Sequence, residues 1–241
     1  MRSHSNIKNM RKNYRHIFFD LDRTLWDFDY NSKMTLNFIF EKLDLKSRGI
    51  KNSNLFIETY KRVNNYLWLQ YRDGVLTKEK LRSRRFAETL NKLGVMDKDL
   101  SEKISSLYIH NSPKQTKLIP YTKYVLSILQ KKYQLHIITN GFKEVQFIKL
   151  KNSGIYDYFQ NIIISEEIGS LKPNKKIFLH AVNLCNSNPK ECLMIGDDII
   201  SDVLGAKQVG IDQVFYNYNN IQGSFDANYT ISDLKELLKI L

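Results

Sequence analysis

The sequence predicts an α/β fold: a doubly wound parallel sheet, or Rossmann-like core, into which an all-helical domain is inserted. Short apolar runs recur along the chain and end on polar residues or glycine, as buried parallel strands do. Segments with helical periodicity lie between these runs. The interval between Asp22 and Thr139 is about twice as long as a strand crossover requires and shows little strand pattern. In chain order, the expected strands are HIFFDLD (16–22), LHIITNG (135–141), NIIISEE (161–167), CLMIGDD (192–198) and DQVFYN (212–217).

The long interval predicts about four antiparallel helices, because apolar residues recur there at helical spacing in successive segments. Gly94 suits a helix end, and Pro113 prevents a helix from continuing. Two segments of chain join this insert to the sheet domain, which makes a natural hinge. We therefore expect an α/β core of residues 14–30 and 113–241, a helical cap of residues 31–112, and a disordered basic tail of residues 1–13.

Composition indicates a globular protein with a sizeable core, since 42% of the 241 residues are hydrophobic and 12% are aromatic. The 37 Lys and Arg exceed the 25 Asp and Glu, which gives a formal net charge of +12. The lysines are scattered and form no compact basic block, so we interpret the charge as compositional bias and expect no nucleic-acid partner. A basic surface still attracts a small anionic substrate.

The chain contains two cysteines, Cys185 and Cys192, both in apolar settings. They indicate buried free thiols in a reducing compartment and not a disulfide framework. The basic N-terminal segment lacks the apolar stretch of a signal peptide, and no apolar run approaches the ~18 residues of a membrane span. We expect a cytoplasmic protein without membrane contact, and the sequence leaves its oligomeric state open.

Two carboxylates stand at the end of the first predicted strand, in the stretch HIFFDLDRTLWDF (16–28). Asp20 and Asp22 share a face, because side chains in extended backbone repeat with period two. Two carboxylates this close need a cation or a shared proton to compensate their repulsion. For an isolated Asp-x-Asp, the alternative is a pair of acids that cap the next helix.

Further polar motifs follow the later strands: TNG at 139–141, Lys172 before Pro173, and GDDIISD at 196–202. Each motif alone is compatible with an ordinary turn, loop or helix cap. In open α/β sheets, however, ligands bind at the carboxyl ends of the strands. All of these motifs would converge at that edge of the sheet, so together they predict a binding site.

In this order, DLDRT, TNG, Lys172 and GDDIISD resemble the four motifs of the haloacid dehalogenase-like hydrolase superfamily. The insert stands where that family carries its first type of helical cap. Three further stretches resemble the bacterial pyrimidine 5′-nucleotidase branch: TNGFKEVQFIKLKNSGIYDYF, ISEEIGSLKPNKKIF and NNYLWLQYRDGVLT. That branch dephosphorylates nucleoside monophosphates, including non-canonical ones.

The resemblance implies a phosphomonoesterase that forms an aspartyl phosphate. It makes Asp20 the nucleophile and Asp22 the acid that protonates the leaving alkoxide and then accepts a proton from water. Lys172 would screen the nucleophile and contact a phosphate oxygen, and Thr24 would fix the turn that holds both acids. The remaining phosphate oxygens would be held by Thr139, Asn140 and the backbone N–H of Gly141.

The family pattern also implies Mg²⁺, which prefers near-octahedral oxygen ligation and retains several waters. Its ligands would be Asp20, Asp197 and the backbone carbonyl of Asp22. Asp202 would orient a metal-bound water or the motif lysine from just outside these ligands. Asp198 is either a further acid of the site or a helix cap, and the sequence does not decide between the two.

Specificity for the leaving group is expected from the cap and from the segment after the carboxylate pair. Trp26 and Phe28 follow that pair directly, and Trp68, Tyr71 and Arg72 cluster at the end of the second predicted cap helix. An aromatic plane beside a guanidinium would suit a nucleoside base. Alternatively, the aromatics pack the helical bundle and the arginine lies in solvent.

Three arginines, Arg82, Arg84 and Arg85, form a basic run that is typical of a solvated helix face, with contact to substrate as the less favoured alternative. His136 lies within a predicted strand and is interpreted as a core residue, because the acid and the base are already assigned. The two cysteines are interpreted in the same way, since a cysteine nucleophile would need a positioned histidine.

We therefore expect a Mg²⁺-dependent phosphomonoesterase for nucleoside 5′-monophosphates, pyrimidine ones first. The nearest alternative is a sugar-phosphate or phosphoglycolate phosphatase, because the four motifs contact only the phosphate. Asp22 argues against dehalogenation, since the true haloacid dehalogenases lack a second aspartate and need no metal. Phosphonate cleavage in the family uses a cap lysine, and because this cap is rich in lysine, that reaction stays open as a disfavoured alternative. From another class, a non-catalytic binding module is the alternative, because fold alone does not establish activity.

Overall fold

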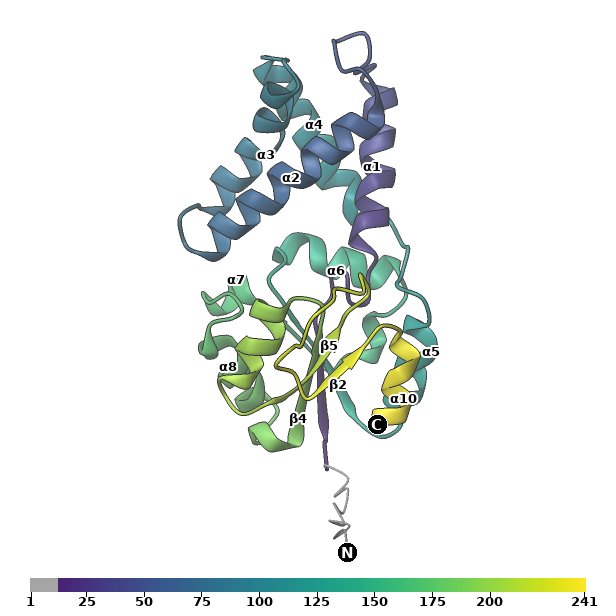
Figure 1. Ribbon diagram of the computed structural model, residues 1–241, viewed down its shortest axis with the longest axis vertical. Helices are drawn as coiled ribbons and strands as arrows, with labels where there is room; N and C mark the ends of the chain where they lie inside the picture. Colours follow the sequence, from purple (N-terminus) through teal and green to yellow (C-terminus); the bar gives the residue numbers. More distant parts are fainter. Residues whose placement is uncertain (1–12) are drawn as a thin grey trace, which may run out of the picture.

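The computed structural model describes residues 13–241, so all but the last residue of the expected tail lies outside the described residues. An α/β domain lies below a bundle of helices (Figure 1). Its strands are all parallel and follow the order β3-β2-β1-β4-β5-β6. The strands are β1 (His16–Phe19), β2 (Gln134–Thr139), β3 (Asn161–Ile164), β4 (Cys192–Gly196), β5 (Asp212–Tyr216) and β6 (Tyr229–Ile231).

This sheet and its flanking helices confirm the predicted fold class, and all five expected strands are present. Strand β6 was not predicted from the sequence; it is only three residues long and lies at the edge of the sheet. Strand β1 lies between β2 and β4, where the strand order reverses. In doubly wound folds the ligand crevice opens at this switch point, beyond the carboxyl ends of the strands.

The strand side chains alternate between two hydrophobic layers. Ile17 and Phe19 of β1 pack in a core shared with α5, α6 and α10, whereas Phe18 packs in a core shared with α8 and α9. Both faces of the sheet are therefore covered, which explains its almost continuously apolar strands. The α-helices of this domain are α5 (Thr122–Leu129), α6 (Lys143–Asn152), α7 (Ser165–Ile168), α8 (Lys175–Leu184), α9 (Gly205–Lys207) and α10 (Leu237–Ile240). Short 3₁₀ helices lie at Ser112–Lys114, Tyr156–Tyr158, Pro189–Glu191 and Leu234–Glu236. A π-helix, η4, spans Ile199–Leu204.

The upper bundle consists of four helices with a hydrophobic core of their own. Each helix begins with a side chain that accepts a hydrogen bond from a backbone N–H of the first turn, which is how Asp, Asn and Thr start helices: Asp27, Asn52, Thr77 and Asp97. The helices are α1 (Phe28–Lys42), α2 (Ser53–Arg72), α3 (Lys78–Lys92) and α4 (Lys98–Asn111).

Two neighbouring segments connect this bundle to the sheet domain. The Asp27 N–H donates to the Lys117 carbonyl at 3.1 Å, and the Ile119 N–H donates to the Leu25 carbonyl at 2.9 Å. The chain thus enters and leaves the four helices at one place. A hinge at these segments stays a prediction.

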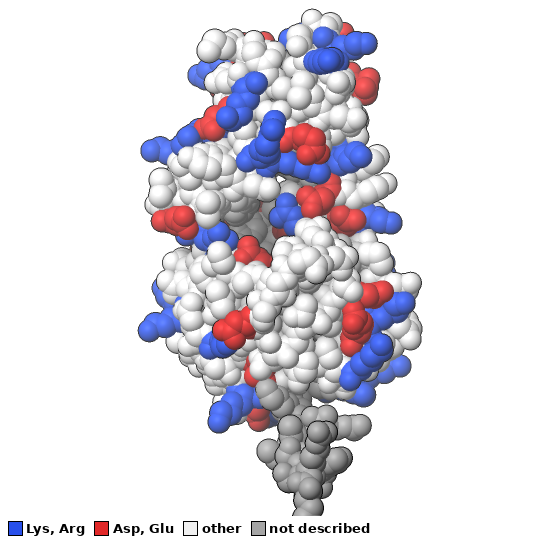
Figure 2. All heavy atoms as spheres, viewed as in Figure 1, with Lys and Arg blue, Asp and Glu red and all other residues white. Residues whose placement is uncertain are grey.

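The described surface carries both signs of charge. On the face shown in Figure 2, Lys and Arg side chains spread over the helices and the sheet domain with Asp and Glu among them. No continuous basic surface forms on that face. Within residues 13–241, no helix is both long and apolar enough to cross a membrane.

Candidate active site

A cavity of ≈ 450 Å³ lies between the cap helices and the carboxyl ends of the strands. Figure 2 shows the recess between the two parts of the molecule. The residues that we call the floor come from strand ends of the α/β domain and from the segments that follow them, and include most of the predicted motif residues: Asp20, Asp22, Thr139, Lys172, Asp197 and Asp202. The residues that we call the cap wall come from helices α2, α3 and α4: Asn64, Trp68, Arg72, Arg82, Arg85 and Tyr108.

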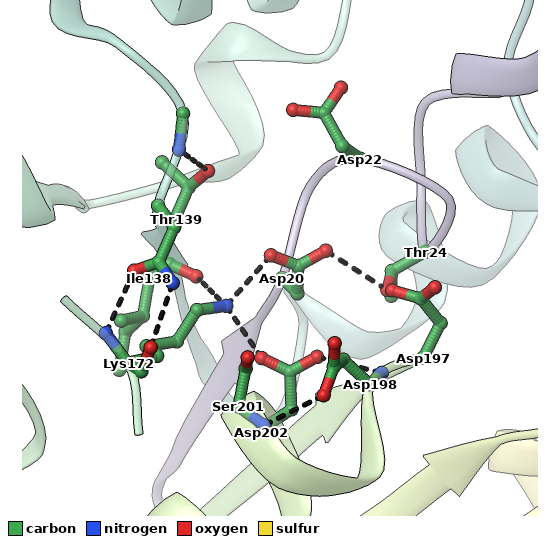
Figure 3. A network of polar contacts seen from close by, with 12 residues as sticks. Asp20, Asp22, Thr24, Ile138, Thr139, Lys172, Asp197, Asp198, Ser201 and Asp202 are labelled. Atoms are coloured by element: carbon green, nitrogen blue, oxygen red, sulfur yellow. Dashed lines mark hydrogen bonds and ion pairs between the residues drawn. The ribbon is translucent and has the colours of Figure 1, made fainter. Parts of the chain in front are cut away.

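A buried ion-pair cluster forms the centre of the floor (Figure 3). Asp20 extends the register of β1, since its N–H donates to the Ile195 carbonyl of β4 at 2.9 Å. The Lys172 Nζ donates to Asp20 Oδ1 at 2.7 Å and to Asp202 Oδ1 at 2.6 Å. It also donates to the Ile138 carbonyl of β2 at 2.8 Å. The ammonium is therefore fixed by three acceptors from three segments: the residue after β1, strand β2 and the π-helix η4.

Burial dominates the electrostatics of this cluster. It raises the pKa of the Asp20 carboxyl although Lys172 opposes the shift, and it raises the pKa of Asp202 to about 7 against the same opposition. Burial alone would lower the pKa of the Lys172 ammonium. The nearby carboxylates of Asp20 and Asp202 have the larger combined effect, so the pKa is raised. Burial and then Asp20 raise the pKa of Asp197 well above its usual value. The positive charge near Asp20, Asp197 and Asp202 therefore does not offset the cost of burying their ionised carboxylates.

The floor residues fit a divalent cation. One carboxylate oxygen each from Asp20, Asp197 and Asp202 lies within 4.8 Å of the others. With Lys172, these three carboxylates leave a formal charge of −2 when all are ionised. Thr24 Oγ1 lies 3.2 Å from Asp20 Oδ2 and 3.4 Å from Asp197 Oδ1 and donates its hydrogen between them. Clustered hard oxygens with uncompensated negative charge are the ligands that Mg²⁺ prefers.

Asp22 points away from this cluster (Figure 3) and is held by helix α6. Lys149 Nζ donates to its two carboxylate oxygens at 2.6 and 2.9 Å, and Gln146 Nε2 donates to Oδ2 at 3.0 Å. Neither Lys149 nor Gln146 was predicted from the sequence as a site residue. The available signal was their spacing of three on a helix that begins just after TNG, which places them on one helix face.

Two glycines of the motifs allow close packing in the floor. A side chain at Gly141 would collide with the Gln146 amide, and one at Gly196 would collide with the Asp202 carboxyl group. The absence of a side chain at both positions therefore lets α6 and η4 approach the strand ends this closely.

The side chains of Asn140 and Asp198 form hydrogen bonds mainly with backbone groups. The Asn140 amide donates to the Lys172 carbonyl at 2.9 Å and accepts from the Lys172 N–H at 2.8 Å, which anchors the loop that carries the lysine. Its predicted contact with phosphate stays a prediction. Asp198 Oδ1 accepts from the first N–H groups of η4 at 2.9 and 2.8 Å, so this aspartate is a helix cap. Its Oδ2 accepts from Arg72 Nη1 at 3.3 Å.

The five candidates for the leaving-group pocket do not all reach the cavity. Phe28, Trp68 and Arg72 line it. Trp26 does not: it is fully buried in the α/β core and donates its Nε1–H to a backbone carbonyl. Tyr71 does not line the cavity either, and packs edge-on against Trp68 at a ring-centroid distance of 5.5 Å.

The arginine run divides into an exposed and a cavity-facing part. Arg84 lies on the outer face and pairs with Glu88 at 2.6 Å. Arg82 and Arg85 line the cavity, where Arg82 pairs with Glu144. The expectation of a solvated face was therefore wrong for Arg85, which is buried.

His136 and the cysteines lie away from the floor. His136 is fully buried, with its Nε2 at 3.2 Å from His16 Nδ1, and burial lowers its pKa to about 4. Both cysteines are free; Cys192 is buried, whereas Cys185 is partly exposed. Burial raises the pKa of the Cys185 thiol to about 11 and that of Cys192 to about 12. None of these groups is poised for nucleophilic chemistry.

Comparisons with known proteins agree with this geometry. A family model of the haloacid dehalogenase-like hydrolases matches residues 14–210. The chain is similar to the pyrimidine 5′-nucleotidase YjjG of Escherichia coli, with 31% identity over 228 residues that cover 93% of this chain and 96% of the relative. It is also similar to the pyrimidine 5′-nucleotidase PynA of Streptococcus pneumoniae, with 27% identity over 232 residues and 95% of each chain covered. Among solved structures, the magnesium-bound HAD-hydrolase YfnB of Bacillus subtilis has a TM-score of 0.86 and 28% identity, covering 95% of this chain and 99% of that one.

Proposed function

The chain belongs to the haloacid dehalogenase-like hydrolases, and on that premise we propose that it is a Mg²⁺-dependent phosphomonoesterase of nucleoside 5′-monophosphates, with pyrimidine nucleotides preferred. The observation that carries the proposal is that one cavity joins the Asp20–Lys172 floor to an aromatic and basic cap wall. The two relatives named as pyrimidine 5′-nucleotidases match nearly the whole chain, cap helices included, which supports the same substrate class.

The proposed reaction splits phosphate transfer into two steps. An oxygen of the Asp20 carboxylate attacks phosphorus, and the bond from phosphorus to the nucleoside oxygen breaks. Asp22 acts as the general acid that gives a proton to that oxygen, and the nucleoside leaves. Asp22 then accepts a proton from the water whose oxygen attacks phosphorus, and the bond from phosphorus to the Asp20 oxygen breaks, which releases phosphate and restores the Asp20 carboxylate.

The floor supports this reaction by holding charge and donors in place. The ammonium of Lys172 is already fixed beside Asp20, so it needs no reorganisation when negative charge develops. Thr139 Oγ1 accepts from the Gly141 N–H at 3.0 Å and from Gln146 Nε2 at 2.7 Å, which leaves its own hydrogen to donate to a phosphate oxygen.

Mg²⁺, when bound, offsets the repulsion between the carboxylate nucleophile and the phosphate. Asp20, Asp197 and the backbone carbonyl of Asp22 would hold it, with Asp202 just outside. In the cap wall, Trp68 stacks on Phe142 of the core at 5.2 Å with an interplanar angle of 26°. Flat apolar surfaces of this kind suit a base better than a small polyol.

The test is phosphate release from UMP, dUMP, dTMP, AMP, GMP, ribose 5-phosphate and phosphoglycolate, with Mg²⁺ or EDTA. We expect release that EDTA abolishes, that is highest with pyrimidine nucleotides, and that Asp20→Asn lowers by about 10⁴-fold or more. Asp157→Asn, a substitution at an exposed aspartate, is the matched control and should retain wild-type activity.

Each part of the proposal can fail separately. Highest release from ribose 5-phosphate or phosphoglycolate would retain the mechanism and overturn the nucleotide assignment. Release that survives Asp20→Asn would overturn the nucleophile. No release from any of the esters would favour a binding module.

A further inference from the structure

Arg85 of helix α3 is a buried guanidinium at the wall of the cavity. It is 7% exposed, and its guanidinium carbon lies 5.0 Å from the Tyr108 ring centroid, 5.4 Å from that of Phe86 and 6.0 Å from that of Tyr60. These rings shield the guanidinium from solvent on the side of the cap. The charge is therefore held at low dielectric, where each missing hydrogen bond has a high cost.

The hydrogen-bonding capacity of Arg85 is largely unused. Its Nη1 lies 3.5 Å from Asn64 Oδ1, at the limit of a hydrogen bond, and its buried Nε has no partner. Among the described residues, no carboxylate forms an ion pair with it. The other arginines that line the cavity each have one: Arg23 with Asp29, Arg72 with Asp198, and Arg82 with Glu144.

Asn64 of helix α2 adds a second free donor beside Arg85. It is 3% exposed and lines the cavity. Its Oδ1 accepts from the Tyr60 hydroxyl at 3.4 Å and faces Arg85, whereas its Nδ2 donates to none of the described residues. The two side chains thus offer hydrogen-bond donors to the cavity, whereas their one acceptor, Asn64 Oδ1, is occupied by the Tyr60 hydroxyl and faces Arg85.

We propose that Arg85 and Asn64 form the specificity pair for the base and donate hydrogen bonds to the C2 carbonyl oxygen of a pyrimidine; this inference rests on the proposed function. Uracil, thymine and cytosine share that oxygen, which has two lone pairs and can accept from both donors. A purine presents its ring nitrogen N3 on the corresponding side of the glycosidic bond, and this acceptor has one lone pair. With a purine, one of the two buried donors therefore stays unpaired, and a site built for hydrogen bonds discriminates against a ligand that leaves one of them unmade.

An acceptor oxygen could also come from a carboxylate, as in phosphoglycolate. The surroundings favour the carbonyl. Trp68, which is partly exposed and stacks on Phe142, also lines the cavity, so an aromatic side chain is present for contact with the rest of a base. A two-carbon acid would leave that side chain uncovered.

The first test measures kcat/KM for UMP and for ribose 5-phosphate, which has no base. Arg85→Met keeps the length of the side chain and its contact with the rings but removes every donor. We expect it to lower the UMP to ribose 5-phosphate ratio by about 10- to 100-fold. Arg84→Met removes a neighbouring charge of the same run on the outer face, and should leave the ratio at the wild-type value.

A second test uses the wild-type enzyme alone and so does not depend on a folded variant. The 2-thio analogue of UMP replaces the C2 oxygen by sulfur, a weaker acceptor, and should lower kcat/KM about fivefold or more. The 4-deoxy analogue retains the C2 oxygen and should stay within about twofold of UMP.

The ratio of kcat/KM for UMP to kcat/KM for ribose 5-phosphate in the wild-type enzyme tests the proposed function. The change in that ratio in Arg85→Met, and the effect of the 2-thio analogue, test the specificity pair. A wild-type enzyme without preference for UMP over ribose 5-phosphate would remove the nucleotide assignment. A clear preference that Arg85→Met and the 2-thio analogue leave unchanged would overturn the specificity pair alone. Loss of phosphoglycolate turnover in Arg85→Met, with UMP turnover retained, would assign the pair to a carboxylate instead.

Discussion

The floor and the cap wall of the cavity differ in how completely their polar groups are paired. In the floor, the Lys172 ammonium has three acceptors and Asp22 has three hydrogen bonds from α6. In the cap wall, Arg85 and Asn64 keep donors that no described residue uses. The floor is thus organised before the substrate arrives, which suits a phosphate that every substrate shares, whereas the cap wall is completed by the variable part of the substrate.

The floor and the cap wall also differ in what positions their side chains. Floor residues follow strands whose register is fixed by the backbone, as in the pairing of Phe19 with Ile137 and with Ile195. Cap-wall residues lie on helices positioned by apolar packing against each other. We therefore expect floor substitutions to affect all substrates alike and cap-wall substitutions to change the ranking of substrates.

The largest expected effect tests the floor. Lys172→Met should lower kcat/KM by about 10³-fold for UMP and ribose 5-phosphate alike, because it removes the fixed positive charge beside Asp20. Lys175→Met, at an exposed lysine nearby, is the control and should leave both values unchanged. Both constants are measured after circular dichroism has established that the variant is folded. A loss confined to one substrate would contradict the division between floor and cap wall.

A smaller effect is expected where α6 holds the proposed acid. Lys149→Met removes two of the three hydrogen bonds to the Asp22 carboxylate, so the acid is less well positioned and kcat should fall by about 10- to 100-fold. KM should change little, and the factor should be the same for UMP and ribose 5-phosphate. Lys151→Met, on an exposed part of the same helix, is the control. A rise in KM without a loss of kcat would show that Lys149, which lines the cavity, binds substrate instead.

The central carboxylate–lysine cluster was predictable because parallel strands end at one edge of a sheet. Asp20, Lys172 and Asp202 are far apart in sequence, yet Asp20 directly follows a recognisable apolar run, and Lys172 and Asp202 each lie in the short segment that follows one. The part that helix α6 plays in holding the floor residues Asp22 and Thr139 was not predictable in this way. Gln146 and Lys149 are buried, but polar residues on a helix suggest a solvated face until the tertiary structure is known.

The cap wall shows the same limit at adjacent positions. Arg84 and Arg85 are neighbours in sequence, and successive residues of an α-helix point about 100° apart. One pairs with Glu88 on the outer face, and the other lies buried at the cavity. Helical periodicity separates the two directions but cannot tell a polar surface from a polar pocket. Trp26 shows the opposite error. It follows the Asp20–Asp22 pair closely and was predicted to contact the leaving group, but it belongs to the hydrophobic core.

The smallest expected effect concerns the contact between cap and core. Glu144 of α6 pairs with Arg82 and, at 3.0 Å, with Lys78 of α3; both cations also lie 4.8 Å from the Phe142 ring centroid. Because these ion pairs are partly exposed, each contributes little. Glu144→Gln should therefore raise KM by about fivefold at most, with kcat unchanged and the difference from wild type reduced at high ionic strength.

The control for this substitution is Glu102→Gln, which removes an exposed carboxylate on the far helix α4 and should leave KM unchanged. If Glu144 serves only to hold the cap against the core, KM rises by the same factor for UMP and ribose 5-phosphate, because both substrates need a closed cavity. A larger factor for UMP would show that Arg82, Lys78 and Phe142 act as one unit on the base. The cap wall would then extend across the domain boundary into α6.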